Sequence, residues 1–195
     1  MIGIFLDIES TGLDPSQHSC AEIAFKVVNL TDGKLLAEFD SIIYQNQENW
    51  DKSDPNSLAV NGFTWELIQN GIKESDAKEQ IIHIFTSLNL SRKNAVFICQ
   101  NPSFDRGFFA QIIPVYTQEE LEWPYHWLDF ASMFWALHIK GPQNKNTSIS
   151  LSKNSIAKYY QLPDEESPHR ARNGVDHLIL CYNKVVGFPE ASNFL

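Results

Sequence analysis

The sequence contains no hydrophobic run that is long enough to cross a membrane. A membrane helix needs about 18 consecutive apolar residues, and no stretch of this chain approaches that length. The first ten residues, MIGIFLDIES, also lack the basic start, the long apolar segment and the small-residue cleavage site of an export signal. We therefore expect neither a membrane protein nor an exported one.

Cysteine is scarce, with three residues at positions 20, 99 and 181. Their number is odd, they lie far apart, and their neighbours are apolar. These features are typical of buried free thiols in a reducing compartment and exclude a disulfide framework. We expect a cytoplasmic protein.

Basic residues are also few. The chain has 15 Lys and Arg against 24 Asp and Glu, a formal net charge of −9, and its basic residues form no cluster. A protein that grips a long nucleic-acid duplex neutralises many phosphates, so this composition argues against such a partner. It leaves room for a small site that meets a phosphate through metal ions.

The remaining composition is that of an ordinary globular protein. Hydrophobic residues make up 43% and charged residues 20% of the 195, values that exclude a disordered tail or a fibrous repeat. We find no internal repeat, low-complexity run or linker. The length fits one domain over residues 1–195.

Short buried strands and amphipathic helices alternate along the chain. Strands are predicted over residues 2–6, 21–28, 34–44 and 95–99, and a strand that turns into a helix is predicted within residues 123–135. Helices are predicted over residues 57–60, 76–88, 150–160 and 173–186, with Ser75 as the N-cap of the second and a polar loop over residues 141–147. This order indicates an α/β sheet with helices on both faces.

Acidic residues follow two of the predicted strands. Asp7 and Glu9 come after the first strand and share one face if the strand stays extended, while Asp105 follows the strand over residues 95–99. Parallel strands bring their carboxyl ends together, and clustered carboxylates repel one another unless a hard cation such as Mg²⁺ or Mn²⁺ lies between them. Taken singly, the acids could equally be polar loop residues, or in the case of Asp105 a helix cap.

His169 lies in a loop just before the last predicted helix. An imidazole with an ordinary pKa of about 6.5 can deprotonate a water at neutral pH. A histidine in such a loop can also be a plain surface residue, and the position alone does not decide between these interpretations.

Three segments together resemble a known family. FLDIESTGL at residues 5–13, NPSFD at residues 101–105 and HRA at residues 169–171 are similar to the three motifs of the DEDDh (DnaQ-like) family of 3′–5′ exonucleases. Glu22-Ile23-Ala24 on the second strand matches as well. The order and separations agree, and the resemblance covers nearly the whole chain.

The resemblance implies a ribonuclease H-like fold, a five-stranded mixed sheet flanked by helices on both faces, and hydrolysis assisted by two divalent ions, Mg or Mn. Asp7 would bridge both ions, Glu9 would help to hold one, Asp105 would hold the other, and His169 would take the proton of the attacking water. The products would be nucleoside 5′-monophosphates. The implied partner is a single-stranded nucleic-acid 3′ end or a short oligonucleotide.

The resemblance also suggests which residues meet the substrate. Main-chain groups around Thr11, Gly12 and Leu13 would meet the terminal nucleotide, with Leu13 packed against its base. The candidate substrate-binding residues are Ser10, Thr11, Gly12, Leu13, Asn101 and Phe104.

One position departs from the family. The fourth acid usually stands five residues after the histidine, where this chain has Gly174. Asp176 stands two residues later, and on a helix that shift turns a side chain by about 200°. Three cases follow: Asp176 is the fourth metal ligand through a changed helix start, three carboxylates suffice with water or Asn173, or the protein binds nucleic acid and cleaves it poorly.

We therefore carry Asp176 as a candidate catalytic and metal-binding residue beside Asp7, Glu9, Asp105 and His169. The alternative function is a catalytically weakened nucleic-acid-binding module of the same fold. A homodimer is a separate possibility, because an aromatic stretch could pack against a second copy, although ordinary core and sheet-edge packing is the preferred explanation. This stretch comprises Trp123, Trp127, Phe130, Phe134 and Trp135.

Overall fold

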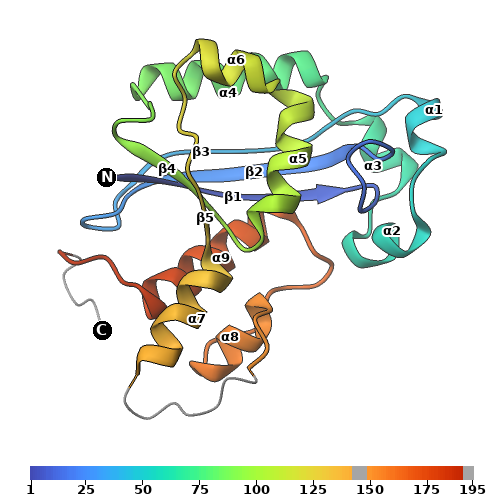
Figure 1. Cartoon of the computed structure of the whole chain (residues 1–195). Helices are drawn as coiled ribbons and strands as arrows, with labels where there is room; N and C mark the ends of the chain where they lie inside the picture. Colours follow the sequence, from blue (N-terminus) through green and yellow to red (C-terminus); the bar gives the residue numbers. More distant parts are fainter. Residues whose placement is uncertain (142–148, 191–195) are drawn as a thin grey trace.

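A five-stranded mixed sheet forms the centre of the molecule (Figure 1). The structure is a computed structural model and describes residues 1–141 and 149–190, so most of the loop predicted over residues 141–147 lies outside the described residues. The strands lie in the order β3-β2-β1-β4-β5, antiparallel among the first three and parallel from β1 to β5. They are β1 (Ile2–Ser10), β2 (Cys20–Asn29), β3 (Leu35–Ile42), β4 (Ala95–Cys99) and β5 (Trp127–Asp129).

Helices cover both faces of this sheet (Figure 1). One face carries α4 (Glu74–Ser87), α5 (Pro102–Ile112) and α6 (Val115–Glu120), and the other carries α7 (Phe130–Lys140), α8 (Lys153–Tyr159) and α9 (Ala171–Val185). Three short helices follow β3: α1 (Gln47–Trp50), α2 (Pro55–Asn61) and α3 (Trp65–Gln69). The predicted α/β sheet with helices on both faces is confirmed.

The central strand β1 separates two hydrophobic cores. Ile4, Leu6 and Ile8 pack into the core beneath α4 and α5, whereas Phe5 packs into the core beneath α7 and α9. Side chains of a strand alternate between the two faces, so Asp7 and Glu9 follow Phe5 onto the face of α7 to α9. The strand thus delivers both carboxylates to one side of the sheet.

Several element boundaries differ from the prediction, and two of these differences concern predicted site or cap residues. β1 runs on to Ser10 because residues up to Glu9 pair in regular antiparallel register with β2, so the acids lie within the strand. Helix α4 begins at Glu74, and the predicted N-cap Ser75 is wrong: it lies inside the first turn, and its Oγ bonds Asp76. Short helices such as α1 and α3 escaped prediction because they are too brief to show a period.

The aromatic stretch that raised the possibility of a dimer is mostly interior. Trp123, Phe130 and Phe134 are buried in the two cores, and Trp127 packs against Phe97, while Trp135 is 43% exposed. Core packing accounts for this stretch. The three cysteines are buried and free, as predicted, and the described part of the chain contains no helix with the length and apolarity to cross a membrane.

Candidate active site

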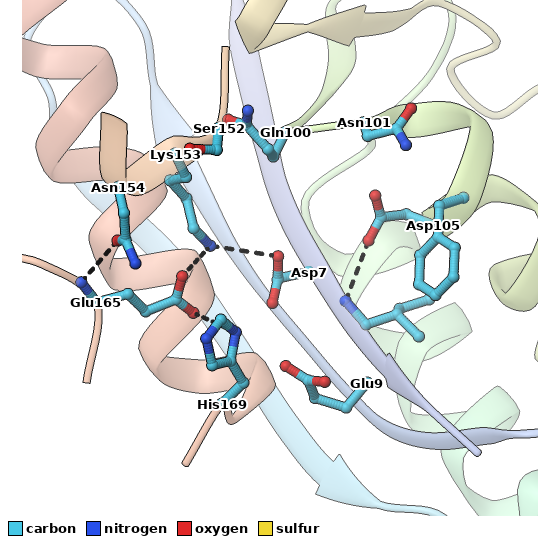
Figure 2. Close-up of a pocket in the computed structure, with 12 residues that line it drawn as sticks. Asp7, Glu9, Gln100, Asn101, Asp105, Ser152, Lys153, Asn154, Glu165 and His169 are labelled. Carbon is cyan, nitrogen blue, oxygen red and sulfur yellow. Dashed lines mark hydrogen bonds and ion pairs between the residues drawn. The ribbon is translucent and has the colours of Figure 1, made fainter. Parts of the chain in front are cut away.

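A pocket of about 340 Å³ opens where β1 and β4 deliver their polar residues (Figure 2). Its walls come from β1, the start of α5, the start of α8 and the loop that precedes α9. The lining residues are Asp7, Ile8, Glu9, Gln100, Asn101, Phe104, Asp105, Ser152, Lys153, Asn154, Glu165 and His169. Asp7, Glu9 and Asp105 from the first two motifs and His169 from the third therefore face one space.

Asp105 reaches the pocket from the first turn of α5. β4 ends at Cys99 and its pairing with β1 stops at Phe5, so β1 extends beyond its parallel neighbour. The main-chain N–H of Ile8 donates to Asp105 Oδ1 at 3.1 Å, and the side chain is 5% exposed. Asp105 makes no helix cap, since the N-cap residue of α5 is Asn101. Its carboxylate instead fixes the edge of β1.

The carboxylates of the pocket resist ionisation. Burial raises the pKa of Asp7 and Asp105, and the pKa of Asp105 is raised further by the charge of Asp7. Burial and the charge of Asp7 raise the pKa of Glu9 to about 8. Groups in this state gain strongly from a cation placed among them, because it stabilises the charged form of each.

The chemistry of these oxygens suits a hard divalent ion such as Mg²⁺ or Mn²⁺. Within residues 1–141 and 149–190, no three Asp, Glu, His or Cys side chains stand close enough to hold one ion as they are arranged. The carboxylates that line the pocket would therefore have to rotate for an ion to be held by three of them. The donor set of Asp7, Glu9 and Asp105 fits one such ion.

His169 lies on the rim of the pocket with its side chain 40% exposed. Its main-chain N–H donates to the carbonyl of Val60 at 3.3 Å, and its Nδ1 lies 3.9 Å from Glu165 Oε1. The imidazole is both accessible to water and directed at the acids (Figure 2). An accessible imidazole beside carboxylates is a group that can accept a proton from water.

A buried carboxylate on β2 anchors the loop that carries His169. Glu22 accepts from Arg170 Nε at 3.0 Å and from the main-chain N–H of Ala171, the first residue of α9, at 2.7 Å. A carboxylate bonded to the first N–H groups of a helix is favoured by the helix dipole. The motif Glu22-Ile23-Ala24 thus has a structural role in positioning the histidine.

Sequence reasoning missed Lys153 and Glu165, which also face the pocket. Lys153 Nζ lies 3.0 Å from Glu165 Oε2 and 3.6 Å from Asp7 Oδ1, and it donates to the carbonyl of Gly174 at 3.1 Å. Burial acts to lower the pKa of Lys153, but the charges of Asp7 and Glu165 outweigh it and raise that pKa. A lysine inside a helix and an acid in a loop carry no motif, so neither residue stood out.

The structure does not bring Asp176 to the pocket. Helix α9 is regular from its start, with the N–H of Gly174 bonded to the carbonyl of Arg170 at 2.9 Å, so no changed helix start redirects the side chain. Asp176 faces β2 and forms an ion pair with Lys26. The expectation that Asp176 supplies the fourth carboxylate is corrected, because two helical positions separate opposite sides of the helix.

The predicted substrate residues divide into two groups. Asn101 and Phe104 line the pocket, whereas Ser10 ends β1, Thr11 to Leu13 lie in the turn that follows, and none of these four residues lines the pocket. The N–H of Thr11 donates to Ser19 and its carbonyl accepts from Asp54, so both main-chain groups are already bonded within the protein. Leu13 is 74% exposed and free to meet a base.

Gly12 is required by close packing in this turn. A Cβ atom at this position would lie 2.2 Å from the ring of His18. No side chain fits there unless His18 moves.

Comparisons with known proteins agree with this geometry. Residues 4–173 match the exonuclease family RNase_T. A PolC-type DNA polymerase III of Thermotoga petrophila is 26% identical over 122 residues, which cover 63% of this chain and 8% of the polymerase. An oligoribonuclease of Paraburkholderia xenovorans is 29% identical over 130 residues, which cover 64% of this chain and 58% of that protein.

Solved structures share the fold. Exonuclease I of E. coli in complex with a dT13 oligonucleotide superposes with a TM-score of 0.75 at 17% identity, over 95% of this chain and 40% of exonuclease I. Cell-death related nuclease 4 gives a TM-score of 0.71 at 13% identity, over 95% of this chain and 63% of that nuclease. The chain spans less than two thirds of the length of each of these four proteins. The ribonuclease H-like fold implied by the three motifs is confirmed, and the match over residues 4–173 shows that the chain belongs to the RNase_T exonuclease family.

Proposed function

We propose that the protein is a divalent-metal-dependent 3′–5′ exonuclease that releases nucleoside 5′-monophosphates from single-stranded ends. The observation that carries this proposal is the convergence of Asp7, Glu9, Asp105 and His169 on one pocket. These residues come from β1, α5 and the loop before α9, which are distant in sequence.

Each of these residues has a distinct role in the proposal. Asp7, Glu9 and Asp105 hold the cation, and His169 accepts the proton of the attacking water. A divalent ion bound among these acids supplies charge neutralisation of the phosphate and lowers the pKa of a coordinated water. The two-ion arrangement implied by the family usually includes a fourth carboxylate five residues after the histidine, where this chain has Gly174.

The substrate in this proposal is a single-stranded end or a short oligonucleotide. A net charge of −9 without a basic cluster disfavours a long duplex. Phe104 in the pocket and the exposed Leu13 in the turn after β1 offer apolar surfaces for bases, and such contacts do not read sequence. The solved exonuclease I that shares the fold holds a dT13 oligonucleotide, which is consistent with this choice.

A second candidate function follows from the changed position 174. With glycine in place of an acid and a lysine directed at Asp7, the protein could bind a 3′ end and cleave it poorly. That reading predicts retained binding of an oligonucleotide without turnover.

The test is degradation of matched 5′-labelled single-stranded DNA and RNA with Mn²⁺ or Mg²⁺. We expect a ladder of shortened products from the wild type and its loss, by at least about 100-fold in rate, in Asp7→Asn. Asp176→Asn is the matched control and is expected to cleave like the wild type, because Asp176 faces β2. A wild type that binds both oligonucleotides and shortens neither would favour the binding module.

A further inference from the structure

The place beside Asp7 that would hold a second ion is surrounded by oxygen atoms and filled by an ammonium group. Lys153 Nζ lies 3.0 Å from Glu165 Oε2, 3.1 Å from the carbonyl oxygen of Gly174 and 3.6 Å from Asp7 Oδ1. Two carboxylates and a main-chain carbonyl are the ligand types that divalent cations such as Mg²⁺, Mn²⁺ and Ca²⁺ take. The ammonium therefore stands where such an ion would find its ligands.

The absence of a side chain at position 174 belongs to the same arrangement. A Cβ atom at Gly174 would lie 2.1 Å from Asp7 Oδ2, so no acid can stand there while Asp7 keeps its position. The carboxylate on this side comes instead from Glu165, in the loop before α9. The helix thus presents no acid at this position, and the loop presents Glu165.

Lys153 meets only one of the two carboxylate oxygens of Glu165 with a hydrogen bond. The Glu165 side chain is 3% exposed, and its Oε1 is buried without a hydrogen-bond partner among the described residues. His169 Nδ1 lies 3.9 Å from Oε1, beyond hydrogen-bond distance. An unpartnered buried carboxylate oxygen at the edge of the pocket is the feature expected of a cation ligand rather than of a purely structural acid.

The two sides of Asp7 have opposite character (Figure 2). Asp105 lies on one side, and Lys153 with Glu165 lies on the other. A divalent ion on the Asp105 side meets carboxylates, whereas one on the Lys153 side would meet a buried positive charge within a few ångströms. Like charges at such separations in a buried site repel strongly.

We infer that the Lys153 ammonium takes the place of the second divalent ion, so that the wild-type pocket holds one ion where the family arrangement implies two. Asp7, Glu165 and the carbonyl of Gly174 form the place that Lys153 fills. This inference rests on the proposed function for its catalytic meaning, and it makes a separate statement about binding.

The experiment counts Mn²⁺ ions bound per chain at pH 7.5, by titration calorimetry and by electron paramagnetic resonance of free Mn²⁺. We expect one ion in the wild type and two in Lys153→Ala, because removal of the ammonium exposes the three oxygens. Lys153→Gln, which keeps most of the side-chain volume, is expected to show the same gain. Lys153→Ala/Glu165→Gln is expected to return to one.

Lys158→Ala is the matched control, since Lys158 is an exposed lysine on the same helix, α8. It is expected to bind one ion, like the wild type. Two ions in the wild type, or no gain in both folded Lys153 variants, would overturn the inference. A wild type that binds no ion and cleaves nothing would refute the proposed function, whereas a gain of one ion in Lys153→Ala would still support the assignment of this place.

Discussion

At the scale of single residues, the pocket contains carboxylates whose charge the folded protein tolerates poorly. Glu9 shows this most clearly, because burial and the neighbouring charge of Asp7 raise its pKa to about 8 from an ordinary value of 4.5. The folded protein then binds a proton at Glu9 more tightly than the unfolded chain does. Protonation of Glu9 therefore stabilises the folded protein fully below pH 4.5, and this stabilisation is lost as the pH rises through about 8.

Metal-free protein should therefore lose stability as the pH rises from 5.5 to 8. In Glu9→Gln we expect the free energy of unfolding to fall by about 1–3 kcal/mol less over this pH range than in the wild type. This figure allows for the partial exposure of Glu9. Urea denaturation in the presence of EDTA at both pH values measures the effect. An equal change in the free energy of unfolding between the two pH values in the wild type and in Glu9→Gln would contradict the raised pKa of Glu9.

His169 is expected to act on the proton of the water and not on the ion. Loss of a general base costs typically about 10²–10⁴-fold in rate. We expect His169→Ala to lose cleavage by that factor while it binds as many Mn²⁺ ions as the wild type. A cleavage rate within about 3-fold of the wild type would exclude this role.

At the scale of elements, the start of α9 sets the position of the histidine loop. Glu22 holds this start through Arg170 and the N–H of Ala171, with its side chain 6% exposed. Glutamine keeps one acceptor oxygen but removes the negative charge and the second acceptor, so the Arg170 guanidinium loses its counter-ion and part of its hydrogen bonding. We expect Glu22→Gln to lower the free energy of unfolding by about 1–3 kcal/mol in chemical denaturation.

Glu38→Gln provides the comparison for this change. Glu38 on β3 also pairs with basic side chains, Lys26 and Arg172, but it is 44% exposed. Exposed ion pairs contribute about 0–1 kcal/mol, so the effect should be small. Equal losses in the free energy of unfolding in the two variants would mean that Glu22 contributes no more to stability than an exposed ion pair does.

The elements differ in how well the sequence predicts them. The buried strands and the helices α4 and α9 show clear periods, and their buried faces agree with the prediction, for example Ala77, Ile81 and Phe85 on α4. The short helix α2 carries its own signal, Asp54 as N-cap before Pro55. The full length of β1 carried no such signal, since only pairing with β2 extends it through two acids.

The site was predictable only where a motif exists. Asp7, Glu9, Asp105 and His169 stand in segments with a family pattern, and the structure brings them together. Lys153 and Glu165 reach the pocket through tertiary packing of α8 and the loop before α9, which sequence spacing does not encode. The direction of the Asp176 side chain could be predicted only with the exact residue at which α9 begins. That residue determines which side chains of α9 face β1 and which face β2.

At the scale of the whole molecule, a bound cation should stabilise the fold. Residues of β1, α5, α8 and the loop before α9 line the pocket together only in the folded chain. An ion that binds only the folded chain therefore raises its stability by mass action. At 100 times its dissociation constant, the gain is about 2.7 kcal/mol. We expect Mn²⁺ to raise the melting temperature clearly at pH 8 and less at pH 5.5, because the raised pKa values of these acids let protons compete more strongly with the ion at the lower pH.

Asp7→Asn should lose most of this stabilisation, and Asp176→Asn should retain it. Differential scanning fluorimetry with and without EDTA provides the comparison. An equal shift at both pH values, or an undiminished shift in Asp7→Asn, would place the ion elsewhere.

The central claim is removal of nucleotides one at a time from a free 3′ end by the acids of this pocket. The most direct test incubates one single-stranded oligonucleotide, labelled at either its 3′ or its 5′ end, with wild-type protein and Mn²⁺ and compares Asp105→Asn. We expect the 3′ label to appear at once as a nucleoside 5′-monophosphate while the 5′-labelled strand shortens stepwise, and we expect neither in the variant. Release of the 5′ label first, internal cuts, or equal activity in Asp105→Asn would contradict the account.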